Sequence, residues 1–237
     1  MRILAFIPAR EKSTRFPGKN LAPFLGQSLL RRAVGVALEA KALGVVDAVV
    51  VSVDNAAMES EARVAGALAH WRSQAVRRDN ATVADVLRDW LMNPQASIGG
   101  VRELQRTNWD AVCVLLPTSP LRTVADVVKS RLLFEAGKAE VCMSVIRWRH
   151  NPWWALTLDS DSFLTPQWVI EPASRPSMAT LRRHCGCVLW ALPQVVVPEG
   201  DFYGRPVLAY EHDGCVDVDT PEDLSYAEFL CSGKGDR

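Results

Sequence analysis

Residues 2–20, RILAFIPAREKSTRFPGKN, begin with an apolar run that ends in a polar, strongly basic segment. The run at 2–7 predicts a buried β-strand, since a short apolar stretch bounded by a proline is typical of one. The polar segment through Asn20 predicts a loop. In open α/β sheets ligands bind outside the carboxyl ends of the strands, so this loop is expected at a ligand site.

The same alternation of apolar runs and amphipathic stretches continues along the chain. Further strands are predicted at 47–53, 110–116 and 141–146, and helices at 28–43, from Asn55 to about Ala69, at 82–91 and at 123–137. Gly44 ends the first helix, and Thr123 with Asp126 has the spacing of a capping box. The pattern predicts a three-layer, doubly wound, mostly parallel α/β sheet of the Rossmann-like class.

The alternation stops after residue 146. Residues 147–200 contain many of the Trp and Pro residues and little helical periodicity, so they are interpreted as an insert in a single domain of 1–237. Strand-like runs return at 187–192, 207–210 and 215–219. The last helix is predicted at 220–230, where Thr220, Pro221 and Asp223 form a well-specified start.

Composition excludes several classes of function. The 27 basic side chains equal the 27 acidic ones, which argues against a nucleic-acid binder. No apolar stretch approaches membrane-spanning length, and the N-terminal run is too short for a signal peptide. The six cysteines show no CxxC pair and no disulfide spacing. We therefore expect a cytoplasmic enzyme with reduced thiols and no membrane partner.

The loop after the first strand carries four cations, two hydroxyl groups and a glycine for a tight turn. They are Arg10, Lys12, Arg15 and Lys19, with Ser13, Thr14 and Gly18. Such a loop suits a triphosphate, although a solvated basic loop is equally compatible with composition alone. The spacing matches neither a Walker A motif nor a GxGxxG loop.

The sequence CVDVDTPEDL places Asp217 and Asp219 two residues apart on a predicted strand. With a period of two, both carboxylates point to one side, roughly 7 Å apart. Mg²⁺ takes one or two protein carboxylates and completes its octahedron with phosphate and water. The alternative is that Asp217 is solvated and that Asp219 only precedes the helix cap.

The basic loop resembles the signature of sugar-activating cytidylyltransferases. The chain satisfies P-A-R-x-x-S-T-R-x-P-G-K, the pattern of CMP-Kdo synthetases, and adds the asparagine of the CMP-sialic acid synthetase pattern. The resemblance implies that Arg10 and Lys19 hold the phosphates of CTP, that Asn20 lies near the ribose, and that Ser13 and Arg15 make further contacts. Glu11 and Lys12 replace the two glycines of the sialic acid branch.

Four further blocks are similar to the same acylneuraminate cytidylyltransferase family. VDVDTPED matches the family's magnesium motif, which implies Asp217 and Asp219 as ligands. LLPTSPLR at 115–122 resembles its L-Q-P-T-S-P-L-R block, which implies substrate contacts from Leu116, Thr118, Ser119 and Arg122. Leu116 replaces a glutamine, and Arg122 has Asp126 as an alternative partner.

Residues 71–87 imply nucleotide contacts from Arg72, Ala81 and Thr82, although a surface charge is an alternative for Arg72. Asp54, in a V-S-x-D block, lies near the nucleotide or is structural.

The resemblance is weakest at 147–200, the region that supplies a dimerisation extension in the family. His150–Pro152 is similar to its H-P element, and Cys185 stands where the family has asparagine. Trp148, Trp153, Trp154 and Trp168 are interpreted as core or as a homodimer interface. Arg175, Arg182 and Arg183 are weaker candidates for an acidic sugar, and His184 is interpreted as a packed or surface residue.

These observations predict an enzyme that transfers CMP from CTP to an acidic, sialic-acid-like nonulosonate with Mg²⁺ and releases pyrophosphate. In-line displacement of this kind needs positioning and charge neutralisation, and no residue stands out as a general base. A Kdo-like sugar or a phosphonate is the alternative substrate. A catalytically silent nucleotide-binding module and an NAD(P)-linked enzyme are the rival classes. The apolar Leu116 leads us to expect that N-acetylneuraminate is a poor substrate.

Overall fold

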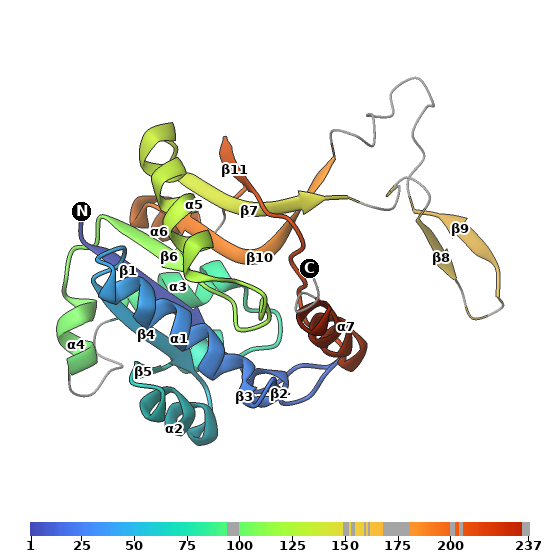
Figure 1. The fold of residues 1–237 in the computed structure, drawn as a ribbon, viewed down its shortest axis with the longest axis horizontal. Helices are drawn as coiled ribbons and strands as arrows, with labels where there is room; N and C mark the ends of the chain where they lie inside the picture. The colour runs from blue at the N-terminus through green and yellow to red at the C-terminus, as the bar shows by residue number, and fades with distance from the viewer. Residues whose placement is uncertain are drawn as a thin grey trace.

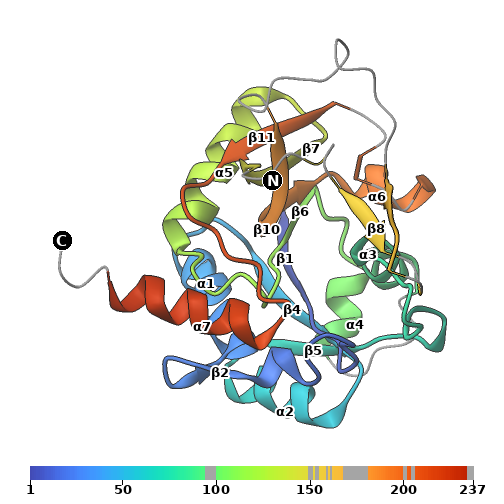
Figure 2. The same cartoon turned by 90° about the vertical axis from the view of Figure 1, so that its right-hand side faces the viewer.

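A mostly parallel sheet with helices on both faces forms the centre of the molecule (Figures 1 and 2). The computed structural model describes residues 1–93, 100–148, 152, 155–158, 160, 162–167, 181–199, 202–203 and 206–233. Within these residues the sheet has seven strands in the order β11-β7-β10-β6-β1-β4-β5. The strands are β1 (Ile3–Pro8), β4 (Ala48–Val53), β5 (Leu68–Trp71), β6 (Ala111–Val114), β7 (Val141–Arg147), β10 (Arg182–Ala191) and β11 (Val207–Glu211).

The side chains of β1 alternate between two hydrophobic cores. Ile3, Ala5 and Ile7 face the core formed with helices α1 (Leu29–Ala42), α2 (Ala56–Val64) and α5 (Val124–Gly137). Leu4 and Phe6 face the core formed with α3 (Val83–Met92) and α6 (Pro193–Glu199), beside α4 (Gly100–Gln105). Both faces of the strand are therefore buried, which explains its unbroken apolar sequence and confirms the predicted three-layer fold.

Polar caps start the helices as the sequence predicts. The side chains of Ser28, Asn55, Thr82 and Thr220 each accept a backbone N–H at the start of α1, α2, α3 and α7 (Pro221–Ser232). Thr123 and Asp126 form a capping box at α5. Short 3₁₀ turns at Lys19–Leu21 and Gln74–Val76 and a two-residue hairpin, β2 (Pro23–Phe24) with β3 (Gln27–Ser28), complete this half of the chain.

Two predicted elements differ from the structure. The helix expected to reach about Ala69 ends at Val64, because Gly66 takes a left-handed φ of 93° and the chain turns back as strand β5. Cys215–Asp219, expected as a strand, is an extended segment outside the sheet. Its Val218 N–H donates to the carbonyl of Thr118, which lies in the loop after β6 and not in a strand. The segment therefore pairs with none of the described strands.

The expected insert at 147–200 contributes to the sheet itself. β10 enters between β6 and β7 and runs antiparallel to both, while β7 and β11 are parallel. A two-stranded hairpin, β8 (Leu156–Leu158) with β9 (Leu164–Pro166), stands away from the body of the molecule in Figure 1. The predictions for His150, Asn151, Trp153, Trp154, Trp168 and Arg175 concern residues outside the described ranges.

No helix in the described part of the chain combines the length and apolar character needed to cross a bilayer.

Candidate active site

A cleft of about 300 Å³ lies at the carboxyl ends of β1 and β6. The chain continues from β1 to β4 on one side and returns to β6 on the other, so the cleft lies where the strand order reverses. Ten of the residues proposed from sequence line it: Arg10, Lys19, Asn20, Arg72, Ala81, Thr82, Leu116, Thr118, Asp217 and Asp219. The rest of the lining was not identified from sequence and consists of Pro8, Val83, Val86 and Pro117.

Hydrogen bonds to its own backbone and to neighbouring loops hold the basic loop in place. Asn20 Nδ2 donates to the carbonyl of Arg10 at 2.8 Å, and Arg10 donates to the carbonyl of Asp79 at 3.1 Å. Asp54 accepts the backbone N–H of Glu11 at 2.8 Å, which gives Asp54 a structural role. The Ser13 hydroxyl accepts the N–H of Phe16 at 3.3 Å. The loop is thus a shaped surface rather than a solvated coil.

The loop also borders a second cavity, of about 590 Å³, against the start of α2. Its polar lining includes Arg10, Lys12, Ser13, Thr14, Asn55 and Asp79. Arg10 and Asn20 belong to both cavities, so a ligand phosphate chain leaving the smaller cleft has cationic surface on either side of the loop. Ser13 lies in this second cavity rather than in the cleft.

The two aspartates point into the cleft although their segment is no strand. Val216 and Val218 are buried in a small apolar cluster with Phe24. The intervening Asp217 and Asp219 therefore face the opposite side, toward the basic loop. Extended backbone gives the alternation on its own, so the expected common side for the carboxylates holds without sheet pairing.

The two carboxylates have different electrostatic environments. Asp219 accepts Lys19 Nζ and an Arg15 guanidinium N–H, each at 2.7 Å. Partial burial opposes its ionisation, but these two cations outweigh burial and lower the pKa of Asp219. Burial raises the pKa of Asp217, and the nearby Asp219 adds to the rise while a hydrogen bond from Thr118 opposes it. Asp219 is thus held in its charged form by its two cations, whereas an added cation would favour the ionisation of Asp217.

These residues fit the requirements of a magnesium ion. Two carboxylates on one side of a cleft supply the oxygen ligands that Mg²⁺ takes from protein, with room left for phosphate and water. Arg15 is mostly exposed, so it is free to move from Asp219 when another cation takes its place.

Arg72 is a buried cation rather than a surface charge. Its Nε donates to the Ser52 hydroxyl and its terminal nitrogen to the Ser52 carbonyl, both at 3.2 Å. Burial lowers the pKa of Arg72 to about 10. Thr82 caps α3 and Ala81 precedes it, so both are placed by the start of one helix. The cleft therefore has one wall built by β4, β5 and α3.

The block at 115–122 divides between the cleft and the interior. Leu116 and Thr118 line the cleft, whereas the Ser119 hydroxyl donates to the carbonyl of Cys185 at 3.2 Å. Arg122 is only 3% exposed and donates to the carbonyls of Leu116 and Cys187, at 3.0 and 2.8 Å. The structure thus gives Arg122 backbone partners in place of the expected acidic group, and Ser119 and Arg122 shape the loop from behind.

A larger cavity, of about 740 Å³, reaches Asp217 from the other side. It is lined by cations at the ends of β7 and β10, namely Arg147, Arg182 and Arg183, and by residues of α7 and the segment before Asp217. Arg182 forms an ion pair with Glu211 at 2.9 Å. The sequence suggested Arg182 and Arg183 only weakly, because nothing local shows that β7, β10 and α7 meet at one point.

A fourth, mainly apolar cavity of about 270 Å³ shares Leu116 and Thr82 with the cleft. Its other walls include His184, Gly186 and Phe202. His184 is half-buried, and its partial burial lowers the pKa of its imidazole. This confirms the interpretation of His184 as a packed residue and places it next to the departure at Leu116.

Comparison with known proteins points to the same family as the motifs. Residues 4–105 match the model of a family described as cytidylyltransferase. The chain is 29% identical to CMP-N,N'-diacetyllegionaminic acid synthase of Legionella pneumophila, over 97% of this chain and 96% of that protein. It is 26% identical to pseudaminic acid cytidylyltransferase of Campylobacter jejuni, over 97% and 96% of the two chains.

A solved structure shares the fold. The structure of CMP:2-keto-3-deoxy-manno-octonic acid synthetase complexed with CTP superposes with a TM-score of 0.69 at 17% identity, over 99% of this chain and all of that one. Full-length similarity to two nonulosonate cytidylyltransferases, the family match and the motifs that line the cleft agree with one another. The chain is thus similar to cytidylyltransferases over nearly all of its length, and its residues 4–105 match the model of that family.

Proposed function

We propose that the chain transfers CMP from CTP to an acidic, nine-carbon nonulosonate sugar and releases pyrophosphate. The observation that carries the proposal is the convergence of Arg10, Lys19 and Arg72 with Asp217 and Asp219 on one cleft. Three cations suit the phosphates of a nucleoside triphosphate. The relatives named for legionaminic and pseudaminic acid support a nonulosonate as the acceptor.

The reaction in this proposal is an in-line attack of a sugar hydroxyl on the α-phosphate of CTP. Lys19 and Arg10 hold the phosphate oxygens and neutralise charge that builds up on the leaving pyrophosphate. Asp217 and Asp219 would hold Mg²⁺, which when bound adds positive charge at the phosphates. Arg72 and the start of α3 position the nucleotide, so that binding energy is used for alignment.

We assign the acidic sugar to the 740 Å³ cavity. It meets the cleft at Asp217, and Arg147 and Arg183 supply positive charge for a sugar carboxylate. A sugar there has its hydroxyl on the Asp217 side, facing the phosphates. The apolar cavity beside Leu116 is the place for an acyl or methyl substituent, since it offers little to a polar group.

We also propose that the protein acts as a homodimer through the β8–β9 hairpin. Leu156, Leu158 and Leu164 are 52%, 67% and 60% exposed, although an isolated two-stranded hairpin is marginally stable in water. A second copy of the chain is the occupant that the family resemblance implies. Light scattering should give the mass of a dimer, and Leu158→Asp should shift it toward the monomer while Leu132→Asp, an exposed leucine on α5, leaves it unchanged.

The cytoplasm is the compartment we propose, because the six cysteines are free and five of them are buried as thiols.

The test of the reaction is pyrophosphate release from each of the four nucleoside triphosphates, with a panel of acceptors. The panel contains N-acetylneuraminate, legionaminate and pseudaminate derivatives, Kdo and a phosphonate. We expect release with CTP and a nonulosonate, and none from the Lys19→Ala variant. Release with Kdo or the phosphonate alone would replace the acceptor in the proposal. CTP binding without release for any acceptor would show a silent nucleotide-binding module.

A further inference from the structure

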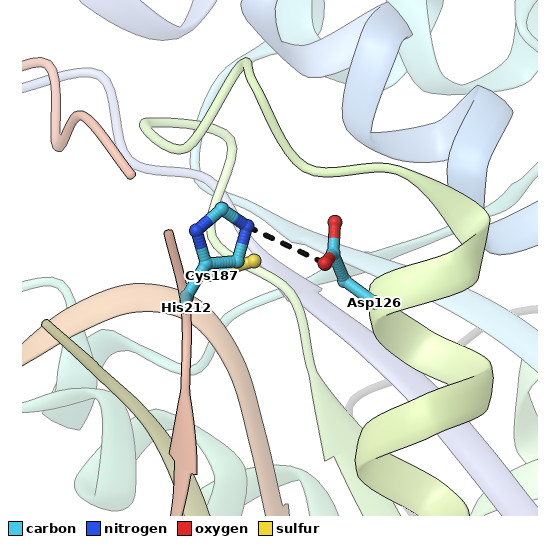
Figure 3. Close-up of side chains that lie close together, drawn as sticks. All are labelled: Asp126, Cys187 and His212. Atoms are coloured by element: carbon cyan, nitrogen blue, oxygen red, sulfur yellow. Dashed lines mark ion pairs between the residues drawn. The ribbon is translucent and has the colours of Figure 1, made fainter. Parts of the chain in front are cut away.

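Behind the active site, three side chains of metal-binding type meet inside the fold (Figure 3). Asp126 comes from the first turn of α5, Cys187 from β10, and His212 from the residue after β11. One carboxylate oxygen, the sulfur and one imidazole nitrogen lie within 4.8 Å of one another. The proposed reaction uses none of the three.

We propose that Asp126, Cys187 and His212 form a binding site for Zn²⁺, separate from the magnesium site. Thiolate, imidazole and carboxylate together are the ligands that zinc takes in proteins, whereas Mg²⁺ and Ca²⁺ select oxygen ligands. The site has a structural role, because it joins α5, β10 and the segment that leads to Asp217.

The distance between the carboxylate and the imidazole fits a shared ion. Two tetrahedral ligands at zinc bond lengths of about 2.0–2.2 Å lie roughly 3.4 Å apart. Asp126 Oδ1 and His212 Nε2 are 3.4 Å apart, which is long for a charge-assisted hydrogen bond. The Cys187 sulfur lies within 4.8 Å of both atoms, so it needs to approach by at most about 1 Å, within the reach of a small side-chain rotation.

Neighbouring groups hold the carboxylate ligand in position. Asp126 Oδ2 accepts the backbone N–H and the hydroxyl of Thr123, both at 2.8 Å, in the capping box of α5. The Tyr210 hydroxyl donates to Oδ1 at 3.0 Å. Contacts of this kind around a ligand fix its orientation and lower the entropy lost when a metal binds.

The sequence around the other two ligands makes tight turns. Cys187 ends the segment Cys185-Gly186-Cys187, and Gly186 has a φ of 72° at the irregularity in β10. His212 begins the segment His212-Asp213-Gly214-Cys215, and Gly214 has a φ of 90°. Both turns need glycine, since other residues are strained at these angles. Each turn thus presents its ligand toward the other.

Charge and access are also compatible with zinc. Binding displaces the thiol proton of Cys187 to solvent and the Nε2 proton of His212 to solvent or to Nδ1, so one thiolate, one carboxylate and a neutral imidazole hold the ion in a neutral unit. Arg122 donates to the carbonyl of Cys187 at 2.8 Å, which places a positive charge beside the residue that becomes the anion. His212 lines the 740 Å³ cavity, so an ion has a route in and a water can take the fourth position.

Cobalt substitution tests the site directly. The full chain, stripped with a chelator under reducing conditions, is titrated with Co²⁺, which reports thiolate coordination by near-ultraviolet charge-transfer absorption. We expect this absorption to saturate at one ion per chain and to disappear when Zn²⁺ is added. Co²⁺ at Asp217 and Asp219 gives no such absorption, because those ligands are oxygens. Saturation without thiolate absorption would therefore overturn the proposal.

Variants assign the ligands. Cys187→Ser and His212→Gln should lose the thiolate absorption or weaken cobalt binding at least about tenfold. Cys231→Ser, a free cysteine on α7 away from the cluster, should behave as the unmodified chain. Zn²⁺ should raise the melting temperature of the unmodified chain and of Cys231→Ser but not of Cys187→Ser. If Cys187→Ser fails to fold, the stoichiometry and the thiolate absorption of the unmodified chain still decide the question. Equal absorption in a folded Cys187→Ser would refute the assignment.

Discussion

At the scale of single residues, Asp217 and Asp219 share a cleft but differ in what surrounds them. Asp219 is held by Lys19 and Arg15, while Asp217 is the more buried and has a raised pKa. We predict that Asp217→Asn and Asp219→Asn each lower magnesium-dependent turnover by about a hundredfold or more, because each removes a charge from the proposed ion. Rates of pyrophosphate release against Mg²⁺ concentration check this.

Glu222→Gln is the matched control, since it removes one exposed negative charge at the start of α7 without entering the cleft. It should leave the rate unchanged. Normal magnesium dependence in both aspartate variants would exclude the two residues as metal ligands. Loss of turnover with a lowered melting temperature would instead point to the Lys19–Asp219 pair as a structural tie.

Leu116 stands where the sialic acid synthetases that this chain resembles have a glutamine. It separates the nucleotide cleft from the apolar cavity that contains His184 and Phe202. We predict that Leu116→Gln raises kcat/KM for N-acetylneuraminate relative to the preferred sugar, because the amide restores a hydrogen-bonding group. Competition between the two sugars measures the ratio directly.

Leu116→Met keeps the position apolar and should leave the ratio near that of the unmodified chain. An unmodified enzyme that already turns over N-acetylneuraminate efficiently would show that Leu116 is a neutral replacement.

At the scale of elements, α3 is tied to the turn that carries Arg72. Asp89 on α3 accepts the hydroxyl of Ser73 at 2.7 Å and its backbone N–H at 3.2 Å. We predict that Asp89→Ala raises the KM for CTP about tenfold, because Ser73 then no longer fixes the neighbouring Arg72. The kcat should change much less, since the variant leaves the basic loop with Arg10 and Lys19 intact. Steady-state kinetics separate the two constants.

Arg88→Gly is the control for helix stability, because Arg88 is an exposed residue in the middle of the same helix, does not line the cleft, and glycine weakens a helix interior. It should lower the melting temperature and leave the KM for CTP unchanged. A similar rise of KM in both variants would mean that α3 stability, and not the position of Arg72, sets nucleotide affinity.

Helix starts were predictable from sequence because their signals are local. Ser28, Thr82 and Thr220 each bond to a backbone N–H three residues ahead, so a few letters contain the whole interaction. Strand pairing is not local. Leu68–Trp71 forms strand β5 because it pairs with β4. Cys215–Asp219 pairs with no described strand, because the chain leaves the edge of the sheet after β11.

The residues of the cleft also differ in how far they could be predicted from sequence. The motifs led to the hypothesis that Lys19 and Asp219 belong to one site, and in the structure the two side chains form an ion pair at 2.7 Å. Spacing does not contain the direction of a side chain, and so it gave no sign that Arg122 turns inward to backbone carbonyls. It also gave no sign of the large cavity, whose cations come from strand ends far apart in the chain.

At the scale of the whole molecule, His70 makes stability depend on pH. It is buried in β5 with no hydrogen-bond partner for either ring nitrogen among the described residues, and burial lowers its pKa to about 4. The unfolded chain binds a proton near pH 6.5, so stability is complete above that pH and falls as the pH drops toward 4. We predict a loss of roughly 2 kcal/mol between about pH 7 and pH 5 from this residue.

Urea unfolding of the unmodified chain and of His70→Leu checks this, because leucine fills the site without titrating. The difference in unfolding free energy between the two proteins should shift in favour of His70→Leu as the pH falls. A difference that stays constant from pH 7 to pH 5 would show that His70 is as easily protonated in the folded chain as in the unfolded one.

The bond between Lys19 and Asp219 joins residues 200 positions apart. The basic loop and the segment that carries Asp219 are therefore brought together only by the folding of the sheet whose strands lie between them in sequence. The cleft is complete only when the extended segment before α7 has docked, because Asp217 and Asp219 both come from that segment.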